Sequence, residues 1–158
     1  MPTSIWRIAC ATPDYVSDDL TGRGAEITGG RWSRKGTPMV YASCSRALAC
    51  LETLVHLAGP EPLPLNRFLV EVVVPDGVWS AREIFQPLFH VGWDAEPPGK
   101  ISMAWGNAWA LGKSSLLAEV PSIVVPEEPN LLLNPAHRDI GQLTAIKLRR
   151  WTDDVSLG

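Results

Sequence analysis

The sequence of 158 residues contains few cysteines, no long apolar run and no excess of positive charge. Its three cysteines are odd in number and lack Cys-x-x-Cys spacing, which indicates reduced thiols in a cytoplasmic protein and not a disulfide framework. No apolar run approaches the roughly 20 residues that a membrane helix needs. The first residues, MPTSIWRIACATPD, also lack the basic and then apolar layout of a signal peptide. We therefore expect a cytoplasmic protein with no membrane association.

The charge balance restricts the partners that the chain can bind. A net charge of −3 argues against a general nucleic-acid-binding protein, which normally carries a basic surplus, but it leaves room for a local cationic pocket that binds one small anion. Apolar residues make up 46% of the chain and charged residues 20%, as in a folded globular protein. The length predicts a single domain over residues 1–158, with residues 152–158 as a candidate disordered tail.

Three local patterns that suggest cofactor or metal binding are incomplete. LGKSS (Leu111 to Ser115) resembles the end of a phosphate-binding P-loop, but Asn107 stands where that motif needs glycine, and a predicted helix precedes it. GRGAEI (Gly22 to Ile27) lacks the third glycine of a dinucleotide fingerprint. The three histidines are not paired with Cys or Asp at metal-ligand spacing. We therefore predict no metal site and no bound cofactor.

Apolar periodicity and turn residues give a coarse secondary structure. They predict helices over residues 45–60 and 100–112, a loop over residues 12–35, and a strand that runs into a turn over residues 67–77. Further strands are predicted over residues 4–11, 38–43, 119–125, 130–134 and 143–151. Gly59 and Pro60 form the stop signal of the first helix, which is expected to run from Ser45 to Ala58. Strands and helices do not alternate regularly, so the expected fold class is α+β.

The segment GGRWSRKGTPMVYAS (Gly29 to Ser43) concentrates three cations beside an aromatic residue. Arg31 follows two glycines, which let the backbone approach a ligand closely, and a guanidinium matches a phosphate with two parallel hydrogen bonds. Tyr41 lies in the next predicted strand, where its ring could stack on a flat aromatic group. This arrangement favours a site for a ligand that carries both phosphate and an aromatic ring.

Glu52 lies within the first predicted helix, on the side that carries apolar residues. A carboxylate there is costly to bury without a partner, so Glu52 is either paired with an arginine in a structural role or a catalytic group. A phosphate clamp, an aromatic platform and one isolated carboxylate are compatible with cleavage of the nicotinamide–ribose bond of NAD+. In that reaction the carboxylate stabilises a cationic, oxocarbenium-like ribose as nicotinamide departs.

Several blocks of the sequence resemble the RES-domain toxins of bacterial RES–Xre toxin–antitoxin pairs. The blocks are WRI (Trp6 to Ile8), residues 29–57, VPSIVVPEEPNLLLNP (Val120 to Pro135) and the following His137. The resemblance implies a fold similar to ADP-ribosyltransferases of the diphtheria-toxin type. It implies consumption of NAD+ as substrate by hydrolysis, phosphorolysis or transfer of ADP-ribose to a protein. It also implies a cognate antitoxin with a helix-turn-helix DNA-binding domain, so that DNA contact belongs to the antitoxin and not to this chain.

By this resemblance the expected catalytic residues are Glu52, Tyr41 and Arg31, and the expected NAD-binding residues are Arg7, Arg31, Tyr41, Ser43, Ser122 and Asn134. Simpler roles remain open for some of them. Ser43 could instead cap the following helix or form a hydrogen bond within the site. Ser122 could be a strand hydroxyl bonded to backbone, and Asn134 could order a turn before Pro135. Many family members have GRWN where this chain has Ser33, and Arg34 and Lys35 could be solvated loop charges.

We expect degradation of NAD+ and growth arrest. The alternatives are mono-ADP-ribosylation of a host protein and a non-catalytic module that keeps the fold.

Overall fold

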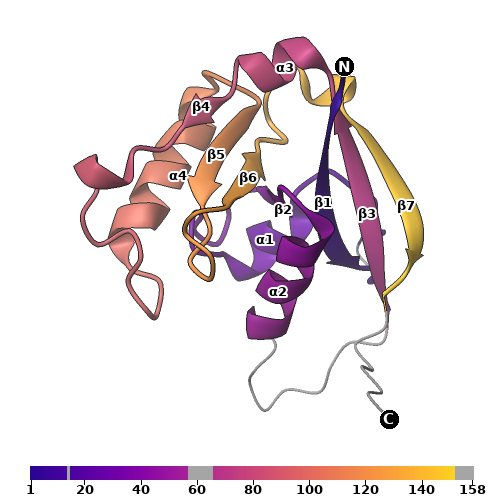
Figure 1. Ribbon diagram of the computed structural model, residues 1–158, viewed down its shortest axis with the longest axis horizontal. Helices are drawn as coiled ribbons and strands as arrows, with labels where there is room; N and C mark the ends of the chain where they lie inside the picture. Colours follow the sequence, from indigo (N-terminus) through magenta and orange to yellow (C-terminus); the bar gives the residue numbers. More distant parts are fainter. Residues whose placement is uncertain (14, 57–65, 152–158) are drawn as a thin grey trace.

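The computed structural model describes residues 1–13, 15–56 and 66–151 and has one seven-stranded sheet (Figure 1). The strands are β1 (Thr3–Cys10), β2 (Val40–Ser43), β3 (Arg67–Val74), β4 (Glu83–Ile84), β5 (Leu117–Pro121), β6 (Pro129–Leu133) and β7 (Thr144–Arg150). Their order in the sheet is β4-β5-β6-β2-β1-β3-β7. Every neighbouring pair is antiparallel except β4 and β5.

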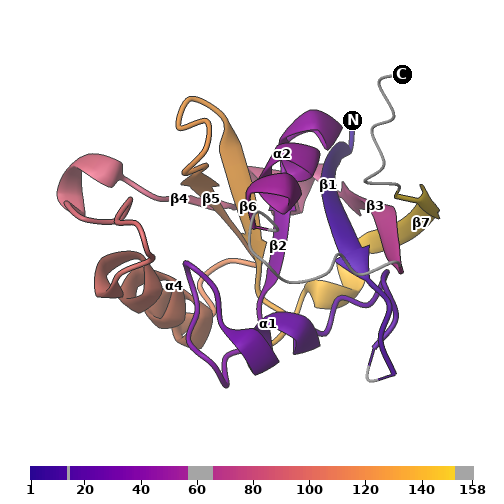
Figure 2. The same cartoon turned by 90° about the horizontal axis from the view of Figure 1, so that it is seen from below.

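In the described part of the chain, four helices and two short 3-10 turns accompany the sheet. They are α1 (Arg23–Thr28), α2 (Arg46–His56), α3 (Asp76–Ser80), α4 (Lys100–Gly112), η1 (Pro87–Phe89) and η2 (Ile140–Gln142). The two views place α4 at the end of the sheet that carries β4 and β5 (Figures 1 and 2). Helix α2 instead contacts the central strands β1 and β2. The mixture of helices with a largely antiparallel sheet confirms the predicted α+β class.

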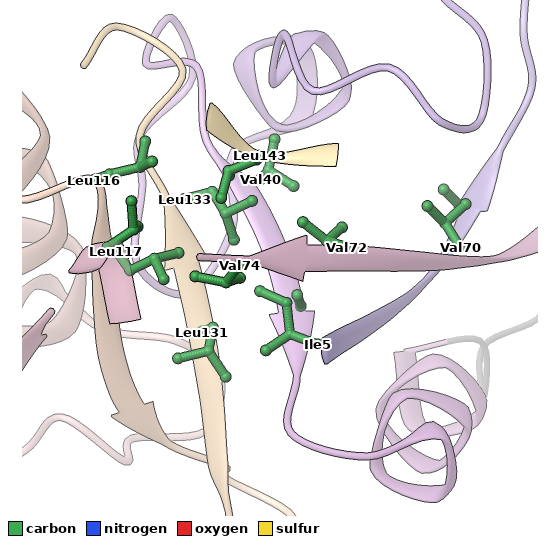
Figure 3. Packing of buried hydrophobic residues seen from close by; sticks show 13 residues of the cluster. Ile5, Val40, Val70, Val72, Val74, Leu116, Leu117, Leu131, Leu133 and Leu143 are labelled. Atoms are coloured by element: carbon green, nitrogen blue, oxygen red, sulfur yellow. The ribbon is translucent and has the colours of Figure 1, made fainter. Parts of the chain in front are cut away.

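One face of the sheet carries the larger apolar core (Figure 3). Alternate residues of each strand point to this face, because successive side chains of a strand lie on opposite sides. Val70, Val72 and Val74 of β3 are fully buried there, and Leu131 and Leu133 of β6 join them. These alternating positions fix the register of the central strands, since a shift by one residue would move the whole set to the other face of the sheet.

The opposite face is covered by two separate clusters. The first cluster lies over β5 and β6 and contains Trp109 of α4 and Trp32 from the loop before β2. The second lies over β1 and β3, where Ala49 of α2 packs with Trp6 and Leu69. Helices α4 and α2 therefore cover different parts of the same face. Strands β2 and β6 lie between β1 and β5 in the sheet, so their side chains on this face lie between the two helices.

Most predicted elements are present, with shifted ends, but two predictions were wrong. The strand predicted over residues 119–125 ends at Pro121, because the Ser122 hydroxyl accepts the backbone N–H groups of Val124 and Val125 and turns the chain. The loop predicted over residues 12–35 contains α1. Helix α3 begins within the segment predicted over residues 67–77, and β4, η1 and η2 lie where no element was predicted. The predicted stop at Gly59 and Pro60, and the tail 152–158, lie outside the described residues.

Candidate active site

Helix α2 begins in a way that sets the position of Glu52. The Ser45 hydroxyl accepts the backbone N–H of Leu48 at 3.1 Å, which is the geometry of an N-cap. Capping is therefore done by Ser45, and the capping role considered for Ser43 was wrong. Leu48 is buried, and Glu52 follows it by one helical turn on the same side. Glu52 is itself half-buried, so the helix carries it to the edge of the packed interior.

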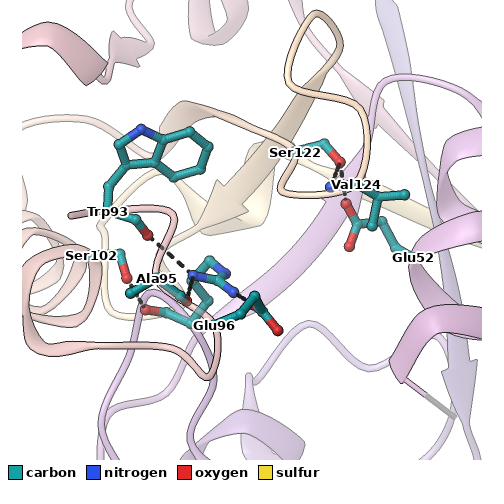
Figure 4. Close-up of polar contacts among 8 residues, drawn as sticks. Glu52, Trp93, Ala95, Glu96, Ser102, Ser122 and Val124 are labelled. Atoms are coloured by element: carbon teal, nitrogen blue, oxygen red, sulfur yellow. Dashed lines mark hydrogen bonds and ion pairs between the residues drawn. The ribbon is translucent and has the colours of Figure 1, made fainter. Parts of the chain in front are cut away.

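The Glu52 carboxylate receives two hydrogen bonds on the same oxygen. The Ser122 hydroxyl donates to Oε1 at 2.5 Å (Figure 4). The Asn130 side-chain amide donates to the same oxygen at 2.8 Å. Ser122 is completely buried and accepts two backbone N–H groups, so its own hydrogen is directed at the carboxylate. In the described residues, Glu52 is thus held by one hydroxyl and one amide donor, and no ion pair with an arginine is found there.

The network continues from Asn130 to β2. The Ser43 hydroxyl donates to Asn130 Oδ1 at 2.7 Å. Ser43 and Asn130 are directly paired in the antiparallel register of β2 and β6, so their side chains share a face. Ser43 is 4% exposed, which leaves its hydroxyl little access to water. The expected hydrogen bond of Ser43 within the site is present, and its partner is Asn130.

Tyr41 lies two residues before Ser43 on the same face of β2. Its hydroxyl accepts the backbone N–H of Trp32 at 3.1 Å and shares a hydrogen bond with Ser33 at 2.7 Å. Ser33, at the position of the family asparagine, therefore anchors the tyrosine. Burial raises the pKa of Tyr41 above its ordinary value, and the hydrogen bonds from Ser33 and Trp32 offset only part of that increase. A Cβ at Gly30 would come within 2.6 Å of the Tyr41 hydroxyl, so only glycine fits against this side chain.

Arg31 is held by a segment that precedes α4. Its Nη1 donates to the carbonyl oxygens of Trp93 at 3.1 Å and Ala95 at 2.8 Å, and its Nη2 forms an ion pair with Glu96 (Figure 4). Burial lowers the pKa of the Arg31 guanidinium, while the negative charge of Glu52 has the largest opposing effect. Arg31 and Glu52 therefore influence each other electrostatically, although they form no direct hydrogen bond in the described residues.

Helix α4 fixes the backbone around Arg31. The Ser102 hydroxyl donates to the Arg31 carbonyl at 2.8 Å, and Asn107 accepts the backbone N–H of Arg34 at 3.2 Å. Between them, a Cβ on Gly106 would lie 1.8 Å from the Trp32 carbonyl oxygen. The glycine lets the helix and the loop approach closely. The side chains of Arg34 and Lys35 are exposed, as their simpler role as solvated loop charges predicted.

Two of the expected NAD-binding residues, Arg7 and Asn134, form no hydrogen bond with Arg31, Tyr41 or Glu52 in the described residues. Arg7 shares the larger core's face with Ile5 and Ala9, because β1 alternates, and its Nη1 donates to the Asp19 carbonyl at 3.3 Å. Asn134 is 1% exposed, with its amide donating to the Ala110 carbonyl at 2.8 Å. Its Oδ1 accepts the backbone N–H two residues later, which is the turn-ordering role left open above. Contact of Arg7 and Asn134 with NAD+ stays a prediction, because their hydrogen bonds in the described residues do not connect them to Glu52.

Asn130, which donates a hydrogen bond to Glu52, was not among the site residues predicted from the sequence. It stands in the same NLLLN block as Asn134, four residues earlier. The only signal for it is the strand period: Asn130 and Leu132 share one face of β6, and Leu131 and Leu133 share the other. Choosing between the two asparagines needs the pairing with β2, which a single sequence does not contain.

Within residues 1–13, 15–56 and 66–151, no three His, Cys, Asp or Glu side chains are grouped closely enough to hold a metal ion. None of the helices in these ranges has the length and apolar character needed to cross a bilayer. The polar groups gathered at the site are hydroxyl, amide, carboxylate and guanidinium groups. This set suits an organic ligand that carries anionic and hydroxyl groups.

Comparison with known proteins identifies close relatives. The family model described as the RES domain matches residues 4–155. The "Prs ADP-ribosylating toxin" of Sphingobium sp. (strain YBL2) is 54% identical over 155 residues, which are 98% of this chain and 96% of that protein. A protein called "Toxin Res" from Pseudomonas putida KT2440 is 36% identical over 154 residues, covering 97% of this chain and 98% of that protein.

A solved structure supports the fold independently. The crystal structure of the M. tuberculosis MbcT-MbcA toxin-antitoxin complex contains a chain that matches with a TM-score of 0.65. The match covers 94% of this chain and 85% of that chain at 18% sequence identity. At that identity the likeness shows a shared fold and says nothing further about the chemistry.

Proposed function

This chain belongs to the RES domain family, and we propose that it is the toxin of a toxin–antitoxin pair that cleaves the nicotinamide–ribose bond of NAD+. The observation that carries the proposal is the state of Glu52. This half-buried carboxylate has one oxygen fixed by Ser122 and Asn130, and it is electrostatically coupled to the cation of Arg31. Such a fixed negative charge suits the stabilisation of a positive charge that appears only during reaction.

The proposed reaction assigns one role to each group. Arg31 binds the pyrophosphate with its guanidinium, and Tyr41 faces the nicotinamide. The bond between the ribose carbon and the nicotinamide nitrogen breaks, and its electron pair leaves with nicotinamide. Glu52 stabilises the positive charge that develops on the ribose, as carboxylates do in glycoside cleavage. A nucleophile then attacks the ribose carbon and releases a proton.

The acceptor of ADP-ribose distinguishes two forms of this function. With water the products are free ADP-ribose and nicotinamide, which depletes NAD+. With a protein nucleophile the product is a modified protein. The name of the Sphingobium relative, 54% identical to this chain, favours transfer to a protein, with Prs as the first target to test. Both forms use the same bond cleavage and therefore the same Arg31, Tyr41 and Glu52.

An antitoxin follows from the proposed activity, because an enzyme that consumes NAD+ in its own cell must be restrained. The structural neighbour is a toxin in complex with its antitoxin, which supports such a partner here. We propose a partner with a helix-turn-helix DNA-binding domain. DNA binding would belong to that partner, in line with the net charge of −3 on this chain.

The decisive experiment combines product analysis with Glu52→Gln, which keeps the size of the side chain and removes its charge. Purified protein is incubated with NAD+, alone and with Prs, and the products are identified by mass spectrometry. We expect turnover to fall by about 10²-fold or more in Glu52→Gln, the scale of losing one preorganised electrostatic partner, while NAD+ affinity changes little.

Thermal unfolding of the same preparation serves as the control for folding. If Glu52 has only a structural role, the variant loses stability and keeps its rate per folded molecule. A stable variant with near-normal turnover would remove Glu52 from the mechanism. Nicotinamide release without modified Prs would select water as the acceptor, and modified Prs would select protein transfer.

A further inference from the structure

The hydrogen bonds around Glu52 extend through Asn130 to Ser43. Asn130 and Ser43 form a chain in which the Ser43 hydroxyl donates to Asn130 Oδ1 and the Asn130 amide donates to Glu52 Oε1. We propose that Asn130 is a positioning residue for Glu52 and that Ser43 acts only through Asn130. The inference rests on the proposed NAD+ cleavage, since the two residues would hold the Glu52 carboxylate in position for that reaction.

The direction of each hydrogen bond in the chain is determined by chemistry. A carboxylate only accepts, so the group of Asn130 that lies 2.8 Å from Glu52 must be its NH2. The opposite end of the amide is then an acceptor, and the Ser43 hydroxyl must donate to it. If the amide flipped, its oxygen would face the carboxylate and repel it. The Ser43 hydroxyl therefore selects the amide orientation that binds Glu52.

Burial makes the choice of orientation strict. Ser43 is 4% exposed, and Asn130 is half-buried between β2 and β5. Removal of the Ser43 hydroxyl would leave Asn130 Oδ1 without this partner in a place where water has little access. The three residues come from distant parts of the chain, with Ser43 and Asn130 separated by 87 positions and Glu52 and Asn130 by 78. Only the β2–β6 register brings them together.

The network also assigns separate tasks to the two carboxylate oxygens. Oε1 receives both Ser122 and Asn130. In the described residues no hydrogen bond to Oε2 is found, so Oε2 is the oxygen available to the ribose. Two donors on one oxygen prevent the carboxylate from rotating, which keeps Oε2 in one direction. Loss of one donor would let it turn, and small misplacements of a reacting group reduce rates strongly.

Steady-state kinetics of NAD+ cleavage test the proposal through a double-mutant cycle. We expect Asn130→Ala to lower kcat about 10-fold and Ser43→Ala about 3-fold, both with smaller changes in KM, because binding by Arg31 is untouched. In the Asn130→Ala background, Ser43→Ala should have no further effect. Ser17→Ala removes another buried serine hydroxyl outside the site and should leave kcat unchanged.

Asn130→Asp supplies a pH readout that a structural role would not produce. The aspartate keeps the acceptor for Ser43 but places a second carboxylate against Glu52. At neutral pH the two charges repel, and turnover should be low. As the pH falls, the pair takes up a shared proton that can bridge the two carboxylates, and kcat should rise relative to Asn130→Ala.

The outcomes separate this inference from the proposed function. Wild-type protein without NAD+ cleavage, alone or with Prs, would overturn both. Active wild type with multiplicative effects of Ser43→Ala and Asn130→Ala would overturn only the inference, since Ser43 would then act independently. Normal kcat per folded molecule in Asn130→Ala, with lowered thermal stability, would also overturn it and leave Asn130 a structural residue.

Discussion

Replacement of Glu96 by glutamine is expected to tighten NAD+ binding. Arg31 is the proposed phosphate ligand, yet its Nη2 forms an ion pair with Glu96 and its Nη1 donates to the Trp93 and Ala95 carbonyls. A phosphate binds a guanidinium best through two parallel hydrogen bonds, and a phosphate that bonds to Nη2 competes there with the Glu96 carboxylate. Glu96 therefore competes with the substrate for the same cation, and neutralising it removes the competitor.

The size of the effect follows from the exposure of the two side chains. Glu96 is 66% exposed and Arg31 is 12% exposed. Solvent-exposed ion pairs contribute about 0.2 to 1 kcal/mol, which corresponds to about 1.4- to 5-fold in a dissociation constant. Because Arg31 is mostly buried, we expect the upper part of that range, about 3- to 5-fold tighter binding in Glu96→Gln.

Isothermal titration with NAD+ measures this change, in the Glu52→Gln background so that the substrate is not consumed. Glu83→Gln is the matched control, because it alters the net charge equally at an exposed residue that accepts from Ser114 and not from Arg31. The difference between the two variants should shrink at high salt. An unchanged or weaker affinity in Glu96→Gln would refute the competition, and an equal gain in Glu83→Gln would assign the effect to overall charge.

Two further predictions concern the support of the site. Gly106→Ala should destabilise the fold by about 1–3 kcal/mol or more, since the added Cβ would clash with the Trp32 carbonyl. A Cβ added at Gly112 would meet no atom within 4 Å, so Gly112→Ala is the control and should keep or raise the melting temperature. Tyr41→Phe should flatten the alkaline part of the stability profile. Because the pKa of Tyr41 is raised, the folded state keeps the hydroxyl proton to higher pH than the unfolded state does. The contribution of Tyr41 to the free energy of unfolding is therefore complete below its ordinary pKa of 10.0 and is lost as the pH rises further. Urea unfolding across that pH range measures this loss.

The parts of the site that depend on local sequence were predictable. Glu52 follows a buried leucine by one helical turn, so the helical period alone places it beside apolar residues. Arg31 and Tyr41 were identified from the glycine-bounded loop and the following strand. These inferences need only a few neighbouring positions, and the structure keeps all three residues on the face shared by α2 and α4.

The parts that depend on strand register were not predictable. Asn130 and Asn134 look alike in the sequence, and only the pairing of β2 with β6 places Asn130 against Ser43. The turn at Ser122 was not predicted either, because Ile123 and the two valines that follow have strong β-propensity and favour a continued strand. Two backbone N–H groups that bond to one buried hydroxyl override that propensity. Tertiary contacts, and not local preference, decide these positions.

Two different sets of hydrogen bonds and close contacts support the site. Arg31 depends on α4, through Ser102 and the close approach at Gly106, whereas Glu52 depends on the β2–β6 register, through Asn130. Binding energy and transition-state stabilisation are thus assigned to different parts of the fold. Changes near α4 should act mainly on NAD+ affinity, and changes near β6 mainly on turnover. Glu52 and Arg31 still interact electrostatically, so effects on affinity and on turnover are not fully independent. Because the Glu52 carboxylate is partly exposed, added salt should weaken this interaction.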